Sequence, residues 1–159
     1  MPPNYFVRDA TSSDIDTIVA FTIREALEAE GFNAKTPAVR RGVAGAFGDL
    51  PVARYWVAED AGQVVGSISV VTEWSNFRGS HYWWIQSLYL VPEHRGTGLV
   101  ELLIDHVTRV AEGAGALDVR LYVHSSNERA AHVYSRCGFT RAPYTMMTRR
   151  LETTQDADR

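Results

Sequence analysis

The sequence has little of what marks several large classes of protein. Its single cysteine, Cys137, excludes an internal disulfide and a cysteine cluster for structural zinc. Basic residues do not outnumber acidic ones (16 against 19), and the net charge of −3 does not favour nucleic acid or an anionic membrane as partner. Neither an apolar run near the roughly 20 residues of a membrane-spanning helix nor a secretory signal pattern is present. We therefore expect a cytoplasmic protein.

The composition of the chain is that of an ordinary globular domain. Apolar residues make up 45% and charged residues 22% of the 159 residues. This length fits the rough prior of about 100–200 residues per domain. We predict a single domain over residues 1–151. Residues 152–159 are polar and lack aliphatic anchors, which predicts a flexible C-terminal tail.

Hydrophobic periodicity predicts that helices and strands share the chain. The predicted helices lie between Asp14 and Gly31 and over residues 38–47, 98–111 and 127–136. The predicted strands span residues 4–8, 53–58, 64–72, 81–91, 117–123 and 144–151, and residues 139–142 would add a seventh. This order predicts an α/β fold in which about four helices flank a mixed, largely antiparallel sheet of six to seven strands.

The turn after residue 91 carries the clearest chemical signal. A predicted strand ends before Pro92, and Arg95-Gly96-Thr97-Gly98-Leu99 opens the next helix. Glycines let the backbone approach a bulky anion, and the first amides of a helix have no internal partner. With the forked cation of Arg95, the segment predicts a pyrophosphate site, and a turn without ligand is the alternative. Its spacing fits neither the dinucleotide fingerprint nor a Walker loop.

Two stretches resemble motifs of the GNAT N-acetyltransferase superfamily. LVPEHRGTG at residues 90–98, followed by an aliphatic helix, resembles the acetyl-CoA motif Arg/Gln-x-x-Gly-x-Gly/Ala. Arg95 and Gly98 match it, whereas Val100 departs from the final Gly/Ala. NERAAHVYSRCGF at residues 127–139 resembles the second signature, with matches at Asn127, Ala130, Tyr134, Gly138 and Phe139. A predicted helix and strand separate the two motifs, as in the family.

The resemblance implies a GNAT-type fold and transfer of an acetyl group from acetyl-CoA to a primary amine, directly in a ternary complex. It implies cofactor contacts at Leu88, Tyr89, Leu90, Arg95, Gly96, Thr97, Gly98, Leu99 and Val100. Asn127 would contact the cofactor arm or hold a water molecule. Tyr134 would protonate the departing thiolate, because a phenol of pKa about 10 can donate to it in the right geometry. Packing on a short helix is the alternative role for Tyr134.

The sequence leaves open which group removes the proton of the amine. An alkyl ammonium has a pKa of about 10.4, so its proton needs an acceptor. Many relatives carry a glutamate nine residues before the Arg/Gln, but this position is Gln86, which can only orient a water or an acceptor amide. We place His124 first because its intrinsic pKa is near neutral. Bulk water, Glu73, His81 and Glu25 are the other candidates.

Aromatic residues that gather around residues 74–84 suggest a pocket for the acceptor. These residues are Trp74, Phe77, Tyr82, Trp83 and Trp84. Alternation puts Trp83 and Trp84 on opposite faces of their strand, so one of them belongs to the core. Aromatic walls suit an aromatic, hydrophobic or cationic small molecule, and core packing is the alternative interpretation. Acidic residues of the first helix, Glu25, Glu28 and Glu30, would attract a cationic amine or face solvent.

Acetylation of a small-molecule amine is the function that these residues favour. A peptide or protein N-acetyltransferase and a non-catalytic acetyl-CoA sensor are the alternatives; Gln86 and Val100 argue for the sensor. A purely structural domain conflicts with the presence of both motifs. His94, His106 and His132 have no metal-type spacing, and we expect no metal. The resemblance is also compatible with a homodimer.

Overall fold

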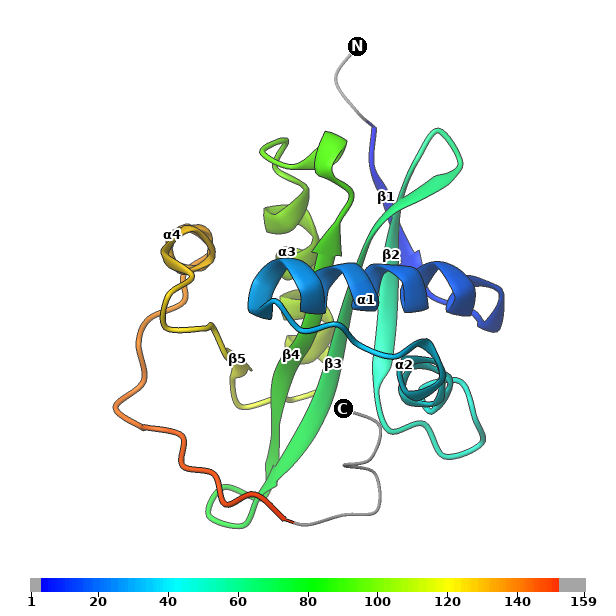
Figure 1. Cartoon of the computed structure of the whole chain (residues 1–159). Helices are drawn as coiled ribbons and strands as arrows, with labels where there is room; N and C mark the ends of the chain where they lie inside the picture. The colour runs from blue at the N-terminus through cyan, green and yellow to red at the C-terminus, as the bar shows by residue number, and fades with distance from the viewer. Residues whose placement is uncertain (1–3, 152–159) are drawn as a thin grey trace.

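A central mixed sheet organises the computed structural model, which describes residues 4–151. The sheet has five strands in the order β1-β2-β3-β4-β5 (Figure 1). These are β1 (Phe6–Asp9), β2 (Arg54–Asp60), β3 (Gln63–Ser75), β4 (Ser80–Leu90) and β5 (Val119–Leu121). Neighbouring strands are antiparallel except β4 and β5, which are parallel. The predicted α/β class and largely antiparallel sheet are thus confirmed.

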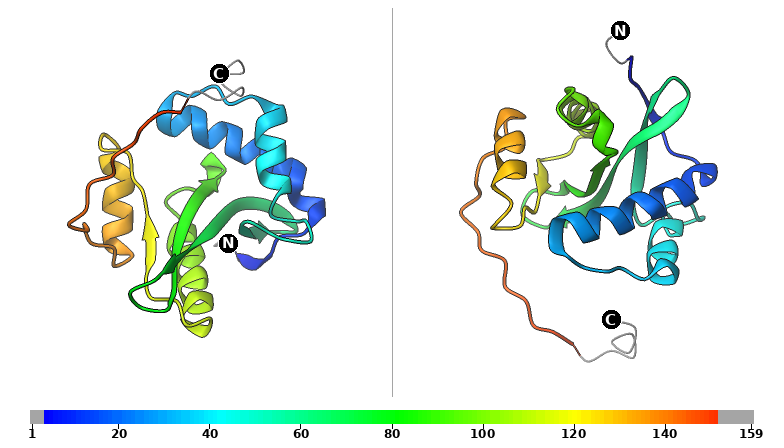
Figure 2. Two further views of the ribbon diagram at one scale, coloured as in Figure 1. Left: turned by 90° about the horizontal axis from the view of Figure 1, so that it is seen from below. Right: turned by 45° about the horizontal axis from the view of Figure 1, so that its top comes forward.

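Helices cover both faces of the sheet. They are α1 (Ile15–Glu30), α2 (Thr36–Ala44), α3 (Leu99–Gly113) and α4 (Glu128–Arg136), with short 3-10 turns at Ser12–Asp14 and Pro92–His94. Helices α1 and α2 lie on one face, α3 lies on the other, and α4 lies beyond β5 (Figures 1 and 2). Within residues 4–151, no helix is both long enough and apolar enough to cross a membrane.

Strand alternation builds a separate core on each face. On β2, Trp56 and Ala58 join the cluster that includes Leu103 of α3, whereas Tyr55 and Val57 join the cluster formed with α1 and α2. This is the period of two that a strand imposes on its side chains. Trp56 is fully buried, and burying a large apolar side chain stabilises the fold by about 1.5–3 kcal/mol.

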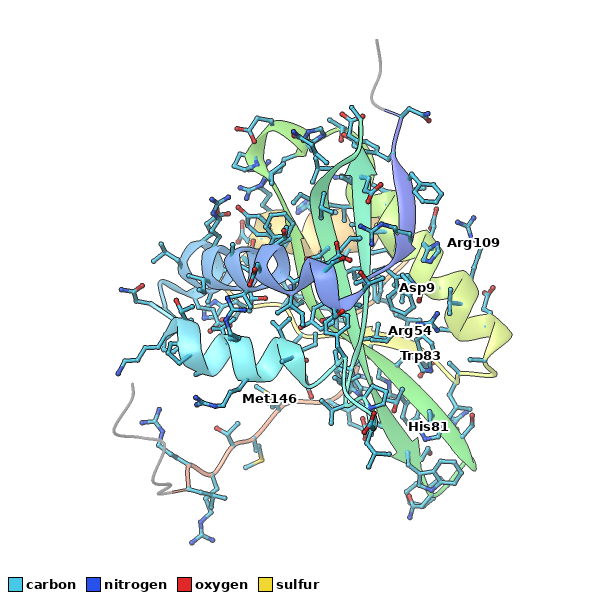
Figure 3. The ribbon with its side chains drawn as sticks, turned by 90° about the vertical axis from the view of Figure 1, so that its right-hand side faces the viewer. Asp9, Arg54, His81, Trp83, Arg109 and Met146 are labelled. Atoms are coloured by element: carbon cyan, nitrogen blue, oxygen red, sulfur yellow. The ribbon has the colours of Figure 1, made fainter. Side chains whose placement is uncertain are left out.

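The two adjacent tryptophans of β4 divide between the faces, as predicted. Trp83 is buried and stacks on Trp56, with ring centroids 6.4 Å apart. Figure 3 shows Trp83, with Asp9 and Arg54, on the side of the sheet that faces α3. Trp84 points to the opposite face and stacks on Tyr122 at 4.5 Å. One tryptophan is therefore core, and the other is available on the face of α1.

Strand β4 carries a β-bulge and, on the side of β5, an edge that is only partly paired. Ser87 pairs with Ser69 and Ile85 with Val70, so Gln86 is an extra residue on β4. On the other side, β5 pairs with β4 only over Trp83–Ile85. Among the described residues, Gln86–Leu90 therefore has no neighbouring strand on the side of β5. Such an open edge can receive another chain or a ligand, although the side chains of Glu25 and Arg95 already meet the Leu88 N–H and the Leu90 carbonyl oxygen.

The predicted strands at residues 139–142 and 144–151 are wrong. Residues 139–151 form an irregular segment, in which Tyr144 is 82% and Met147 is 92% exposed. Alternating apolar residues do not make a strand unless a sheet edge supplies hydrogen-bonding partners. The described chain therefore has five strands rather than six to seven, beside the four helices that were expected. The predicted tail at 152–159 lies outside the described residues.

Candidate active site

The turn from β4 into α3 has the backbone shape that an anion site requires. Gly96 and Gly98 both adopt positive φ angles, +74° and +86°. Gly98 is the N-cap of α3 in the left-handed conformation that favours glycine. The first amides of α3 are consequently presented at the mouth of the turn, where the helix dipole favours negative charge.

Arg95 lies at the end of the open edge of β4. Its Nε donates to the carbonyl oxygen of Leu90 at 3.1 Å, and its guanidinium pairs with the Glu28 carboxylate at 2.7 Å. The Thr97 hydroxyl donates to the His94 carbonyl oxygen at 2.7 Å and also contacts the Tyr5 hydroxyl at 2.8 Å. The turn is thus held in place by its own side chains, with Arg95 between the edge and α1.

A groove of about 470 Å³ runs between the beginning of α3 and α4. Its α3 side includes Gly96, Gly98 and Val100, and its α4 side carries Arg129, His132 and Arg136. Sequence analysis missed the contribution of α4 and treated His132 as incidental. The signal was available, because residues three, four and seven apart share one face of a helix. The groove combines helix amides with two arginines, of which Arg136 is paired with Glu101 at 3.2 Å, and amides and arginines suit phosphate groups.

Helix α4 and its N-cap position Asn127 and Tyr134, two of the five matching residues of the second motif. The amide oxygen of Asn127 caps α4 by accepting from the Ala130 N–H at 3.1 Å, so its NH2 group is the part that can serve a ligand. Tyr134 is half-buried and meets Phe139 edge to face at 6.0 Å. Burial and the charge of Glu25 raise the pKa of the Tyr134 hydroxyl, so the phenol keeps its proton at neutral pH.

Glu25 of α1, one of the candidate bases named from the sequence, reaches the open edge of β4. One carboxylate oxygen accepts from the Leu88 N–H at 3.1 Å, and the other accepts from the Ser87 hydroxyl. Burial raises the pKa of Glu25, although these two hydrogen bonds partly oppose the shift. Leu88, expected to contact a cofactor, is therefore joined to an acidic side chain of α1.

The remaining predicted residues occupy more exposed places. Gln86 is the bulge residue itself and is exposed on β4. His124 lies on the exposed loop between β5 and α4, where its Nδ1 and the Ser126 hydroxyl are 2.8 Å apart. Tyr89 and Leu90 are buried, and Leu99 lies in the core under α3. Through Gln86 and residues 88–90, the open edge contributes several of the predicted residues to one place.

Aromatic side chains extend the site along the face of α1. The Arg120 guanidinium lies 3.4 Å from the ring centre of Tyr82 and 5.7 Å from that of Trp84. Trp84 donates its indole N–H to Glu73 at 2.6 Å. Of the other predicted members, Trp74 meets His81 edge to face, and Phe77 is 94% exposed at the hairpin tip. No group of three or more His, Cys, Asp or Glu within residues 4–151 is arranged to hold a metal ion.

Comparison with known proteins places this geometry in one family. A profile of the Acetyltransferase (GNAT) family matches residues 21–139. Thialysine N-epsilon-acetyltransferase of Bos taurus is 28% identical over 141 residues, 83% of this chain and 82% of its own length. Streptothricin acetyltransferase of Escherichia coli is 28% identical over 78 residues, 49% of this chain and 42% of its own length.

A solved structure shares the fold over nearly its full length. The crystal structure of a possible acetyltransferase from Clostridium difficile 630 has a TM-score of 0.87 at 27% identity, over 94% of this chain and 99% of its own. The sequence matches are shorter. This chain spans 35–42% of the length of several curated relatives that it matches.

Proposed function

The chain belongs to the GNAT family of acetyltransferases, and on this premise we propose that it transfers the acetyl group of acetyl-CoA to the primary amine of a small molecule. The amine attacks directly while both substrates are bound. The observation that carries the proposal is the convergence, around the open edge of β4, of the glycine turn, the groove beside α4 and the Tyr134 hydroxyl.

The residues around the turn fit acetyl-CoA. The α3 amides, Arg129 and Arg136 surround a groove of a size that suits phosphates, and Arg95 lies in the turn before α3, where it donates to the Leu90 carbonyl oxygen. The backbone of Leu88–Leu90 offers an edge along which an amide-containing arm binds as an added strand does. Val100 lines the groove from α3 with its side chain, and its helical amide is unaffected by the departure from the motif.

The chemistry assigns a role to each polar group near the edge. Acetyl-CoA supplies a thioester, whose acyl carbon is activated toward amines. Tyr134 holds a proton at neutral pH and donates it to the departing sulfur. Gln86 at the bulge is proposed to orient the amine or a water molecule, and His124 in the loop before α4 is the base that the sequence favours. Asn127 is proposed to contact the cofactor arm through its NH2 group.

The face of the sheet beside the open edge of β4, on the side of α1, supports a small-molecule acceptor. Trp84, Tyr82 and Tyr122 present aromatic rings there, and Glu73 adds a negative charge. Such a surface recognises a flat or cationic molecule. The names of two relatives, a thialysine and a streptothricin acetyltransferase, are consistent with an acceptor of that size.

The test is a screen of amines with detection of the free thiol of CoA. We expect thiol release that depends on both acetyl-CoA and a small amine, and an acetylated product by mass spectrometry. Acetylation of peptides but not of small amines would favour the peptide alternative. Tight cofactor binding without turnover on any amine would favour the sensor.

A further inference from the structure

Glu25, a residue of α1, makes two hydrogen bonds with β4. Its carboxylate accepts one hydrogen bond from the Leu88 N–H and one from the Ser87 hydroxyl. Both partners follow the bulge at Gln86 directly. Glu25 is half-buried there, and burial disfavours its charged form, so that this place on β4 costs stability which the two hydrogen bonds only partly offset.

The Leu88 N–H points out of the sheet toward the open edge. Val91 donates its N–H to Val65 on β3, and successive amides of a strand point to alternate sides. The amides of Leu90 and Leu88 therefore face away from β3. The Leu88 amide is the donor nearest to the bulge, and the cofactor arm of the proposed function lies along this edge. Glu25 thus stands where the acyl end of that arm would meet the strand.

We propose that Glu25 is the group that accepts the proton of the acceptor amine. This inference rests on the proposed function and replaces His124 in that role. The Glu25 carboxylate bonds to the Leu88 N–H, where the proposed cofactor arm ends, and its charge raises the pKa of the Tyr134 hydroxyl. The transfer needs a base and an acid near one reacting centre.

The other candidates are engaged elsewhere. Glu73 is exposed and accepts from the Trp84 indole at 2.6 Å. His81 packs edge to face against Trp74 near the far end of β4. His124 is exposed and its ring contacts Ser126. Glu25 is the one carboxylate among these candidates that combines partial burial with a contact to the open edge of β4.

The surroundings of Glu25 raise its pKa above that of an exposed carboxylate. The titratable groups around it are Glu28 and Glu30 on α1, Tyr55 on β2 and Tyr134 on α4, and Arg95 is paired with Glu28. Burial raises the pKa of Glu25, and Glu30 raises it further, while the bonds from Ser87 and Leu88 lower it. A carboxylate with a raised pKa is a stronger base toward an ammonium than an exposed one.

The proton balance of the step closes without another reactant. Glu25 takes one proton from the ammonium, and the neutral nitrogen bonds to the acyl carbon as the carbon–sulfur bond breaks. Tyr134 gives its proton to the sulfur and regains one from the nitrogen, which leaves an amide and a thiol. Glu25 then releases its proton to solvent, so each turnover yields one proton.

The test compares Glu25→Gln with the wild type on an amine found in the screen. We expect at least a 100-fold lower kcat at pH 7, with acetyl-CoA affinity within about threefold of wild type. The residual rate of the variant should rise about tenfold per pH unit toward the amine pKa of about 10.4, because only spontaneously neutral amine then reacts. The wild-type rate should level off above the pKa of Glu25. Glu25→Asp should recover part of the rate.

Asp16→Asn is the matched control, because it removes a carboxylate charge from the same helix at an exposed residue outside the proposed site. It should keep the wild-type rate. Glu25→Gln should keep or raise the melting temperature, since it removes a carboxylate with a raised pKa. Equal kcat and equal pH profiles in the wild type and Glu25→Gln, or a loss of rate explained by a lower melting temperature, would overturn the inference. No acetylation by the wild type would instead overturn the proposed function.

Discussion

The Tyr134 hydroxyl is half-buried, and its surroundings raise its pKa, so it enters the reaction protonated. We predict that Tyr134→Phe lowers kcat at least tenfold, about 1.4 kcal/mol of barrier, because the thiolate then leaves without a proton donor. Acetyl-CoA affinity should change little, since the ring is retained. Steady-state kinetics and calorimetry test this. An unchanged kcat under conditions where chemistry limits the rate would remove Tyr134 from the acid role.

Asp14 is a buried carboxylate that joins the beginning of α1 to the sheet. It pairs with Arg8 at 2.8 Å and accepts from the Thr11 N–H at 2.8 Å. We predict that Asp14→Asn lowers the free energy of unfolding by about 2–3 kcal/mol, because Arg8 loses a charged partner. Chemical denaturation checks this. Asp16→Asn, at an exposed ion pair with Arg40, should stay within about 0.5 kcal/mol.

The same residue predicts how stability depends on pH. The hydrogen bond with Arg8, and that from Thr11, lower the pKa of Asp14 below its ordinary 3.8. The contribution of the Asp14 carboxylate to the free energy of unfolding is therefore complete above pH 3.8 and is lost as the pH falls through its lowered pKa. Asp14→Asn should lack that part of the acid-induced loss of stability. The free energy of unfolding of both proteins is measured by denaturation at several acidic pH values. If it falls equally with pH in the wild type and in Asp14→Asn, this assignment is contradicted.

If Arg95 binds the cofactor phosphates as proposed, Glu28 competes with them for its guanidinium. The two side chains form an ion pair at 2.7 Å, and both are partly exposed. We predict that Glu28→Gln strengthens acetyl-CoA binding by about two- to fivefold, the range that an exposed pair of up to about 1 kcal/mol allows. Calorimetry at low and high salt measures this, with Glu30→Gln as control. Weaker binding in Glu28→Gln would place Glu28 among the cofactor contacts instead.

At the scale of elements, the junction of β4 and α3 is set by the backbone at Gly98. Its φ of +86° is unfavourable for a residue with a side chain, although a Cβ there would meet no atom within 4 Å. We predict that Gly98→Ala lowers the free energy of unfolding by about 1–2 kcal/mol and weakens acetyl-CoA binding. Gly113→Ala, within α3 and without positive φ, should instead be neutral or stabilise by up to about 1 kcal/mol. Equal effects of the two substitutions would contradict the role of Gly98.

The sequence correctly predicted the helices and strands that a local hydrophobic pattern marks. The helical repeat that buries Leu99, Leu103 and Val107 identified α3, and alternation around Trp83 and Trp84 identified β4 and its two faces. The sequence overextended β5, which covers only Val119–Leu121, and wrongly predicted strands after residue 138. Those errors have one cause, because an edge strand depends on partners that local periodicity does not reveal.

At the scale of the whole molecule, the site is assembled from segments far apart in the chain. Glu25 and Ser87 are 62 residues apart in sequence, and Arg95 and Glu28 are 67 apart. The layering of α1 against the sheet makes these contacts (Figure 1). Motifs identified Arg95 and Tyr134 because each motif is a short segment of one family pattern. The sequence named Glu25 only as one of several candidate bases, and spacing alone could not place it before His124, since that depends on which face of α1 meets β4.

The central claim is that this protein binds acetyl-CoA at the turn between β4 and α3. Calorimetric titration of the wild type and Arg95→Ala with acetyl-CoA tests it most directly. The account predicts micromolar binding by the wild type and at least tenfold weaker binding by the variant, because Arg95 supplies the cation of the turn between β4 and α3. No binding by the wild type at millimolar acetyl-CoA, or equal affinities in both proteins, would contradict it.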